Sequence, residues 1–162
     1  MNLQSDDFEL FGLERCFAQS RSAVDARWKD LQREAHPDKF SLQGAAAQRV
    51  AMQWSVRINE AYQRLKNPVR RAAYLCELHG SPIRAEDNTS MPTAFLMQQM
   101  EWREALDDAN TAPALDALDD AVAQTRGQAL ARCEQLIDVQ RDFAAAAQEV
   151  RALMFIARFG ED

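Results

Sequence analysis

A histidine and an aspartate stand two residues apart at His36-Pro37-Asp38. An imidazole beside a carboxylate could act as an acid–base pair. The neighbouring sequence offers neither a nucleophile nor a third group that would orient the imidazole, which disfavours catalysis. Proline fixes the backbone of a turn, so the segment is expected to present His36 and Asp38 at the tip of a helix. That geometry suits the docking of a partner protein, with a purely structural turn as the alternative.

Residues that could bind a metal are few. The chain holds three cysteines, Cys16, Cys76 and Cys133, and two histidines, His36 and His79, and its cysteines form no CxxC pair. The odd count and the wide spacing favour reduced, partly buried thiols over disulfides. Cys76 and His79 lie three residues apart on an expected helix, but two ligands do not make a zinc site. The sequence also lacks a GxxxxGK[ST] loop for ATP, and we expect no metal, no cofactor and no catalytic residue.

Three basic residues, Arg27, Lys29 and Arg33, share one side of a helix expected to begin near residue 20 and to end before Pro37. Taken alone, this basic side is most simply a solvated helix face. The other side carries apolar residues at helical spacing, which predicts a core-facing stripe: Val24, Trp28, Leu31 and Ala35.

The composition points to an all-α protein. The 162 residues are 47% hydrophobic and 27% charged, with only 5 glycines and 5 prolines, too few turn residues for a sandwich or barrel. A net charge of −6 argues against nucleic acid as the main partner. No apolar run approaches the roughly 20 residues that cross a bilayer, and the acidic start does not resemble a signal peptide. We therefore expect neither nucleic acid nor membrane as a partner, and a cytoplasmic location.

Charge divides the chain into two modules. Residues 1–78 carry 12 Lys+Arg against 10 Asp+Glu, whereas residues 79–162 carry 7 against 15. The segment 79–92 is polar, bracketed by prolines and without a helical apolar period. The predicted organisation is an N-terminal domain at 1–78, a linker at 79–92 and a C-terminal domain at 93–162.

The first module is expected to pair two amphipathic helices in antiparallel fashion. A short helix over residues 6–13 precedes the pair, a loop at 40–44 joins its two members, and Pro68 opens another short helix after it. The second member of the pair carries a long apolar stripe: Ala47, Val50, Trp54, Ile58, Ala61 and Leu65.

The second module is predicted to be a three-helix bundle with helices over about 93–109, 114–139 and 142–159. Pro113 and the region 138–142 supply the breaks. The apolar stripe of the middle helix is expected to face the bundle core: Leu115, Leu118, Val122, Ala129, Cys133 and Leu136.

The first helix of this bundle is apolar on two sides. Leu96, Met97 and Met100 point about 100–200° away from the direction of Phe95. Such a second apolar arc should be partly exposed, and methionine is adaptable at protein-binding surfaces. In the last helix Phe155 lies about 120° from the main stripe, so it too is expected to be partly exposed. The alternative is that these residues pack against a neighbouring helix or the other domain.

Several segments carry a family resemblance. The segment His36-Pro37-Asp38-Lys39-Phe40 resembles the signature of a J-domain. J-domains carry similar sequences where this chain has Ile58-Asn59-Glu60-Ala61-Tyr62 and Asn67-Pro68 followed by Arg70-Arg71-Ala72-Ala73-Tyr74.

Nearly the whole chain is similar to the HscB family, the J-proteins of iron–sulfur cluster assembly. The similarity rests on residues 7–13, 74–80 and 93–101 in addition to the J-domain segments. The chain departs from the family at Ala35, where J-domains usually have an aromatic residue, and at Met100, where relatives often have leucine.

The resemblance implies a co-chaperone rather than an enzyme. Such a protein binds the iron–sulfur scaffold IscU, delivers it to an HscA chaperone of the DnaK type and stimulates the ATPase of that chaperone. The implied chaperone-binding residues are Arg27, Lys29, Arg33, His36, Pro37, Asp38 and Lys39. The implied scaffold-binding residues are Leu96, Met97, Met100, Glu101, Arg103, Glu104 and Phe155.

Three alternatives stay open at this point. The first is a J-domain co-chaperone for a different client protein. The second is a metal- or heme-handling enzyme that uses His36, His79 and the cysteines. The third is a helical adaptor in which the His-Pro-Asp sequence is incidental.

Overall fold

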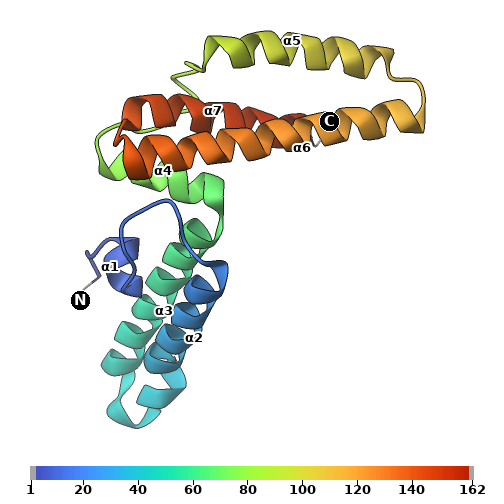
Figure 1. The fold of residues 1–162 in the computed structure, drawn as a ribbon. Coiled ribbons are helices and arrows are strands. Elements are labelled where there is room, and N and C mark those ends of the chain that lie inside the picture. Colours follow the sequence, from blue (N-terminus) through green and yellow to red (C-terminus); the bar gives the residue numbers. More distant parts are fainter. Residues whose placement is uncertain (1–2, 161–162) are drawn as a thin grey trace. The chain divides into compact units, whose positions relative to one another are not determined.

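The computed structural model describes residues 3–160, and every regular element in that range is helical, which confirms the all-α prediction. Figure 1 shows the helices in chain order. Their bounds are α1 Asp7–Phe11, α2 Arg21–Ala35, η1 Pro37–Gln43, α3 Ala45–Lys66, α4 Pro68–Leu78, α5 Thr93–Asp108, α6 Ala112–Glu134, η2 Gln135–Val139 and α7 Phe143–Phe159. Within residues 3–160, no helix is both long and apolar enough to cross a membrane.

The chain forms two compact units, Met1–Arg71 and Ala72–Asp162. The boundary therefore lies inside α4, earlier than the predicted end of the first domain at residue 78. Arg71 is tied to the first unit, because its Nε donates to the carbonyl oxygen of Phe17 at 2.7 Å.

The segment predicted as a linker, residues 79–92, is fixed to the second unit. The buried guanidinium of Arg151 on α7 donates to the carbonyl oxygens of Ile83, at 3.0 Å, and Ser90, at 3.1 Å. The side chain of Ile83 is itself buried. A polar, proline-bracketed sequence does not reveal such backbone contacts, and this segment is part of the C-terminal unit.

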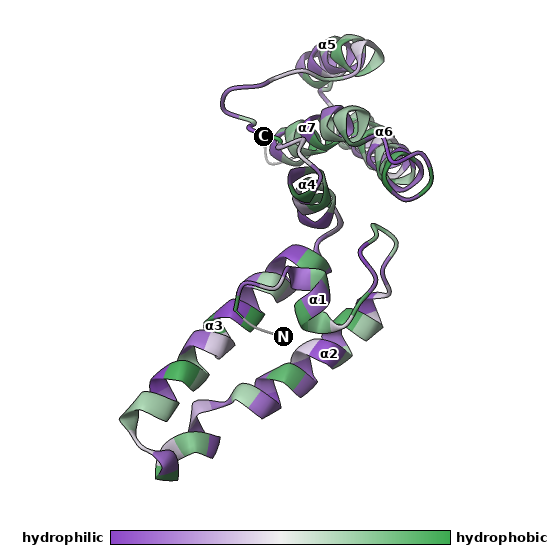
Figure 2. Ribbon diagram, turned by 90° about the vertical axis from the view of Figure 1, so that its left-hand side faces the viewer, coloured by the Kyte–Doolittle hydropathy of each residue, from purple (hydrophilic) through white to green (hydrophobic). Residues whose placement is uncertain are grey.

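In the first unit, α2 and α3 pack side by side and α1 contacts both at one end (Figures 1 and 2). Asp6 caps α1 by accepting from the Glu9 backbone N–H at 2.9 Å. Gly12 ends α1 with φ of 65°, a conformation that glycine adopts without steric cost. The core joins side chains of all three helices: Phe8, Leu10, Phe11, Val24, Leu31, Ile58, Ala61 and Leu65.

Two details of this unit differ from prediction. The expected loop over residues 40–44 is mostly helical, because the 3₁₀-helix η1 runs from Pro37 to Gln43. Val50, predicted to face the core, is 51% exposed. It lies in the second turn of α3, so the apolar period there includes a residue that the packed core does not cover.

In the second unit, α6, η2 and α7 pack against one another, and α5 contacts α6 and also α7, through the ring pairs Phe95–Phe155 and Trp102–Phe159. The predicted break at 138–142 is confirmed, since Asp142 caps α7 by accepting from the Ala145 backbone N–H. Leu115 is 42% exposed, so the predicted stripe of the middle helix does not extend to its first turn. The buried residues of this unit include Leu75, Cys76, Phe95, Trp102, Cys133, Ile137, Val150 and Leu153.

Candidate partner-binding sites

The His-Pro-Asp sequence sits where α2 ends and η1 begins. His36 adopts an extended conformation, with ψ of 129°, because a residue before proline avoids the helical region. Its Nδ1 accepts a hydrogen bond from the Asp38 backbone N–H at 3.2 Å, which orients the ring over the first turn of η1. The side chains remain solvated, 56% exposed for His36 and 92% for Asp38. Their chemistry is therefore available to a partner protein.

The pair of helices that presents this sequence is braced by side-chain contacts. The rings of Trp28 on α2 and Tyr62 on α3 stack with centroids 4.6 Å apart. Trp28 Nε1 donates to Asn59 Oδ1 at 2.9 Å, and the Tyr62 hydroxyl donates to Asp25 at 2.8 Å. The hydrogen bonds from Tyr62 and from Arg21 lower the pKa of the Asp25 carboxyl. These contacts hold the register of α2 against α3 and thus the position of the turn between them.

The basic residues predicted to bind a chaperone divide into two kinds. Lys29 and Lys39 are exposed, and Arg33 is exposed beside Asp30, with which it forms an ion pair. Arg27 instead supports the fold, because its Nε donates to the carbonyl oxygen of Phe11 at 2.8 Å. Its half-buried side chain connects α2 to the end of α1, a role that the sequence pattern does not reveal.

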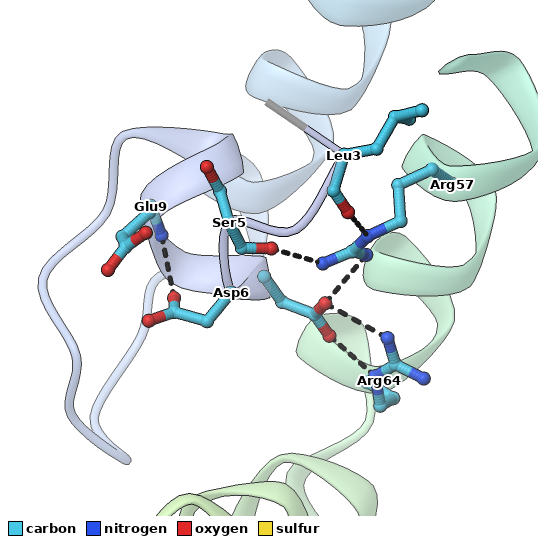
Figure 3. A network of polar contacts seen from close by, with 7 residues as sticks. Leu3, Ser5, Asp6, Glu9, Arg57 and Arg64 are labelled. Carbon is cyan, nitrogen blue, oxygen red and sulfur yellow. Dashed lines mark hydrogen bonds and ion pairs between the residues drawn. The ribbon is translucent and has the colours of Figure 1, made fainter. Parts of the chain in front are cut away.

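Two arginines of α3 that belong to no recognisable sequence motif converge on α1. Asp7 is fully buried, and its carboxylate pairs with Arg57 at 2.8 Å and with Arg64 at 2.6 Å. Arg57 also donates to the carbonyl oxygen of Ser5 at 2.7 Å (Figure 3). The partners lie far apart in sequence, and this network fixes α1 on α3 rather than forming a binding surface.

In the second unit, α5 exposes the apolar arc expected from its helical angles. Phe95 and Trp102 are buried, at 6% and 3% exposure, whereas Leu96, Met97 and Met100 are 45%, 63% and 66% exposed. Three charged residues among the proposed scaffold-binding set are also exposed on this helix: Glu101, Arg103 and Glu104.

Phe155 does not belong to this exposed arc. It is half-buried on α7, and its ring lies edge-on to Phe95 at 6.0 Å and stacks with Phe159 at 6.4 Å. The guanidinium of Arg103 lies 5.9 Å from the Phe155 centroid. Of the two possibilities that the helical angles leave open for Phe155, exposure or packing against a neighbouring helix, the structure shows packing, because the ring lies against the buried Phe95 of α5.

Known proteins are similar to this chain in sequence over its whole length. The family model of the HscB C-terminal oligomerisation domain matches residues 91–162. A "Co-chaperone protein HscB homolog" from Ralstonia nicotianae is 49% identical over 100% of this chain and 94% of that protein. A homolog of the same name from Burkholderia multivorans is 47% identical, also over 100% of this chain and 94% of its own length.

The chain belongs to the HscB co-chaperone family.

Solved structures of HscB proteins confirm the fold class. The crystal structure of human co-chaperone protein HscB matches with a TM-score of 0.89 at 26% identity, over 99% of this chain and 81% of that one. The chaperone HscB from Vibrio cholerae matches with a TM-score of 0.81 at 35% identity, over 97% and 94%. The predicted order, a J-domain followed by a C-terminal helical bundle, is therefore that of HscB.

Two cysteines and one histidine of this HscB-family chain, Cys76, Cys133 and His79, are placed for packing. Cys76 and Cys133 are buried free thiols, and burial raises the pKa of Cys76 to about 11 and that of Cys133 to about 12. His79 stacks on Phe143 with ring centroids 4.0 Å apart. Across residues 3–160, no group of three or more His, Cys, Asp or Glu side chains is arranged to hold a metal ion.

Proposed function

We propose that this protein is a co-chaperone of iron–sulfur cluster assembly in the bacterial cytoplasm. It binds the scaffold IscU, delivers it to an HscA-type chaperone and stimulates the ATPase of that chaperone, without catalysing a reaction itself. Membership of the HscB family supports the co-chaperone role.

The observation that carries the proposal is the exposure of Asp38 and His36 at the turn of a braced helical pair. A carboxylate that is 92% exposed and lies on a short helix contributes little to the fold. The water around this carboxylate can be replaced by contacts with a partner protein. A solvated loop residue loses few contacts within its own protein when that partner docks. His36, Pro37 and Asp38 are therefore assigned to contact with the chaperone.

The exposed basic residues near this turn are assigned to the same surface. Lys29, Arg33 and Lys39 would attract an acidic partner face and raise the rate of encounter. Arg27 is retained in this set, but its hydrogen bond to Phe11 gives it a structural part as well.

The scaffold site is assigned to the outer side of α5. Leu96, Met97 and Met100 offer apolar area to a client, and Glu101, Glu104 and Arg103 surround it with charge. Apolar side chains left in water on an otherwise amphipathic helix are typical of protein-binding surfaces. Phe155 contributes indirectly. Its ring packs on Phe95 and so helps to hold α5, the helix that presents the exposed apolar residues.

The deciding experiment is a steady-state ATPase assay of an HscA-type chaperone with this protein and IscU, alone and together. We expect stimulation by the protein, and a larger effect when both are present. Stimulation without any added effect or binding of IscU would favour the alternative of a J-domain co-chaperone for a different client. If the ATPase rate of the chaperone did not change when this protein was added, the proposal as a whole would be contradicted.

A further inference from the structure

An apolar cavity of about 500 Å³ opens between α2 and α3 in the first unit. Its lining comes from α2, η1 and α3 and also includes Leu10 of α1, and it is mostly aliphatic or aromatic. The lining includes Ala35, Phe40, Ala47, Val50, Ala51 and Trp54. A volume of this size lies in the range of ligand-binding pockets.

The cavity exists because small residues face one another across it. Ala35 on α2 and Ala47 and Ala51 on α3 contribute only a methyl group each. Well-packed helical pairs fill this position, since unfilled volume lowers stability. Val50, at 51% exposure, remains in contact with water instead of being covered.

The same short helix links the cavity to the His-Pro-Asp sequence. Pro37, Asp38 and Lys39 form the first turn of η1, and Phe40 and Gln43, which follow on η1, line the cavity. All residues of η1 are exposed or half-buried, so the packed core holds this helix only weakly. A group seated in the cavity would contact η1 directly and would help to fix the position of Asp38.

We propose that this cavity receives one large apolar side chain, a leucine, methionine or phenylalanine, from the chaperone that docks on His36 and Asp38. Because η1 carries both features, one partner surface reaches both at once. Charge next to the lining residues in the sequence supports this occupant, because the exposed Arg33 precedes the lining residue Glu34 and the exposed Lys39 precedes the lining residue Phe40. Basic side chains at these positions favour an apolar anchor with carboxylates near it. This inference rests on the proposed function and adds a pocket that selects the partner by shape.

The test fills the cavity and leaves the motif intact. Ala35→Phe fills it from α2 and Ala47→Leu from α3, and Ala46→Leu, at an exposed neighbouring position of α3, is the matched control. The readouts are the melting temperature, the concentration of protein that gives half-maximal stimulation of the HscA-type chaperone, and binding of IscU.

We expect both filled variants to melt at a higher temperature than the wild type, because cavity filling improves packing. Half-maximal stimulation should need about tenfold more protein, since the partner loses one buried apolar anchor. IscU binding and the Ala46→Leu control should be unchanged. The two filling directions guard against a single variant that folds poorly.

Filled variants that melt higher and stimulate like the wild type would overturn the inference and leave the proposed function standing. A change of the sedimentation coefficient in the filled variants alone would also overturn it, because the occupant would then be a second copy of the chain. If the wild type does not stimulate the chaperone, the proposed function itself fails, and the partner assigned to the cavity is wrong.

Discussion

The Asp7 carboxylate accepts two hydrogen bonds from the guanidinium of Arg64, at 2.6 and 2.9 Å, although 57 residues separate them in the chain. Asp7 is fully buried and also pairs with Arg57. Such a carboxylate is costly to desolvate alone, but bidentate geometry and a second arginine compensate for the loss of water. The short helix α1 is thereby held on α3, and α3 in turn forms one side of the pair that presents the His-Pro-Asp turn.

Replacing Asp7 by alanine should therefore strongly destabilise the first unit. We expect the free energy of unfolding to fall by about 3–5 kcal/mol, because two partly buried guanidinium groups lose their counter-charge. Urea denaturation followed by circular dichroism measures this. The control is Glu9→Ala, on the same helix, whose side chain is 61% exposed and should cost less than about 1 kcal/mol. Equal stabilities of the two variants would show that the buried pair contributes nothing.

His36→Gln and Asp38→Asn are expected to abolish stimulation of the chaperone. Their effect on stability should stay below about 1 kcal/mol, because both side chains are largely solvated. ATPase assays at saturating protein, together with a thermal melt, separate the two effects. Glu60→Gln, an exposed position on α3, serves as control. Wild-type stimulation by either variant would remove that side chain from the mechanism.

Lys29 and Arg27 should behave differently although both are basic residues of α2. Lys29→Glu is expected to slow association with the chaperone and to leave stability unchanged, since Lys29 is exposed. Arg27→Ala should lower the free energy of unfolding by about 1–3 kcal/mol, because the Phe11 carbonyl loses its charged donor.

The salt dependence of stimulation provides the second measurement for this face. Exposed charges are screened over about 8–10 Å near 0.1–0.15 M salt, so apparent affinity should fall as salt rises. Lys29→Glu should flatten that dependence. Stimulation that does not change with salt would argue decisively against an electrostatic role.

Variants of Leu96 and Met97 are expected to affect IscU binding, whereas a variant of Phe155 is expected to affect stability. The double change of Leu96 and Met97 to alanine should weaken IscU binding at least about tenfold, equivalent to about 1.4 kcal/mol, with little change in melting temperature, since both side chains are exposed. Phe155→Ala should instead lower the melting temperature, because the ring packs on Phe95 and Phe159. Isothermal titration with IscU and thermal melts give the two readouts. If the double variant bound IscU with wild-type affinity, the assignment of the client site to α5 would be wrong.

The burial of two thiols predicts how the cysteines react with a thiol reagent and how the stability of the protein changes with pH. At pH 7.5 Cys76 and Cys133 should resist a thiol reagent in the native protein and react after denaturation, because burial raises their pKa from 9.0 to about 11 and about 12. The half-buried Cys16 should react first.

The same shifts set the direction of the stability change in alkali. Each folded pKa lies above the ordinary value of 9.0, so the full contribution to stability is present below pH 9 and is lost as pH rises through 11 and 12. The free energy of unfolding should therefore decline above about pH 9. A Cys76→Ala, Cys133→Ala double variant should show a shallower decline between pH 9 and 11 by urea denaturation. An identical slope in both proteins would contradict the assignment.

Local sequence was sufficient for the helices and their ends. Pro37 forces His36 out of the helical region, and Ser20 and Asp142 supply side-chain caps, so α2 and α7 begin and end close to where the pattern places them. The exposure of Leu96, Met97 and Met100 also follows from helical angles alone, because a helix cannot bury all of its sides against one neighbour.

What the tertiary structure decided concerns which side chains meet. Asp7 and Arg64 find each other only after α1 crosses α3, and Arg27 serves α1 only because Gly12 turns the chain toward α2. The helical angle of Phe155 leaves both exposure and packing open, and the position of α5 decides for packing against Phe95. The cavity beside Ala35 likewise depends on how residues of α1, α2, η1 and α3 come together around it. Periodicity reports the side of a helix that avoids water, whereas the identity of the contacting residue depends on the packing of elements distant in sequence.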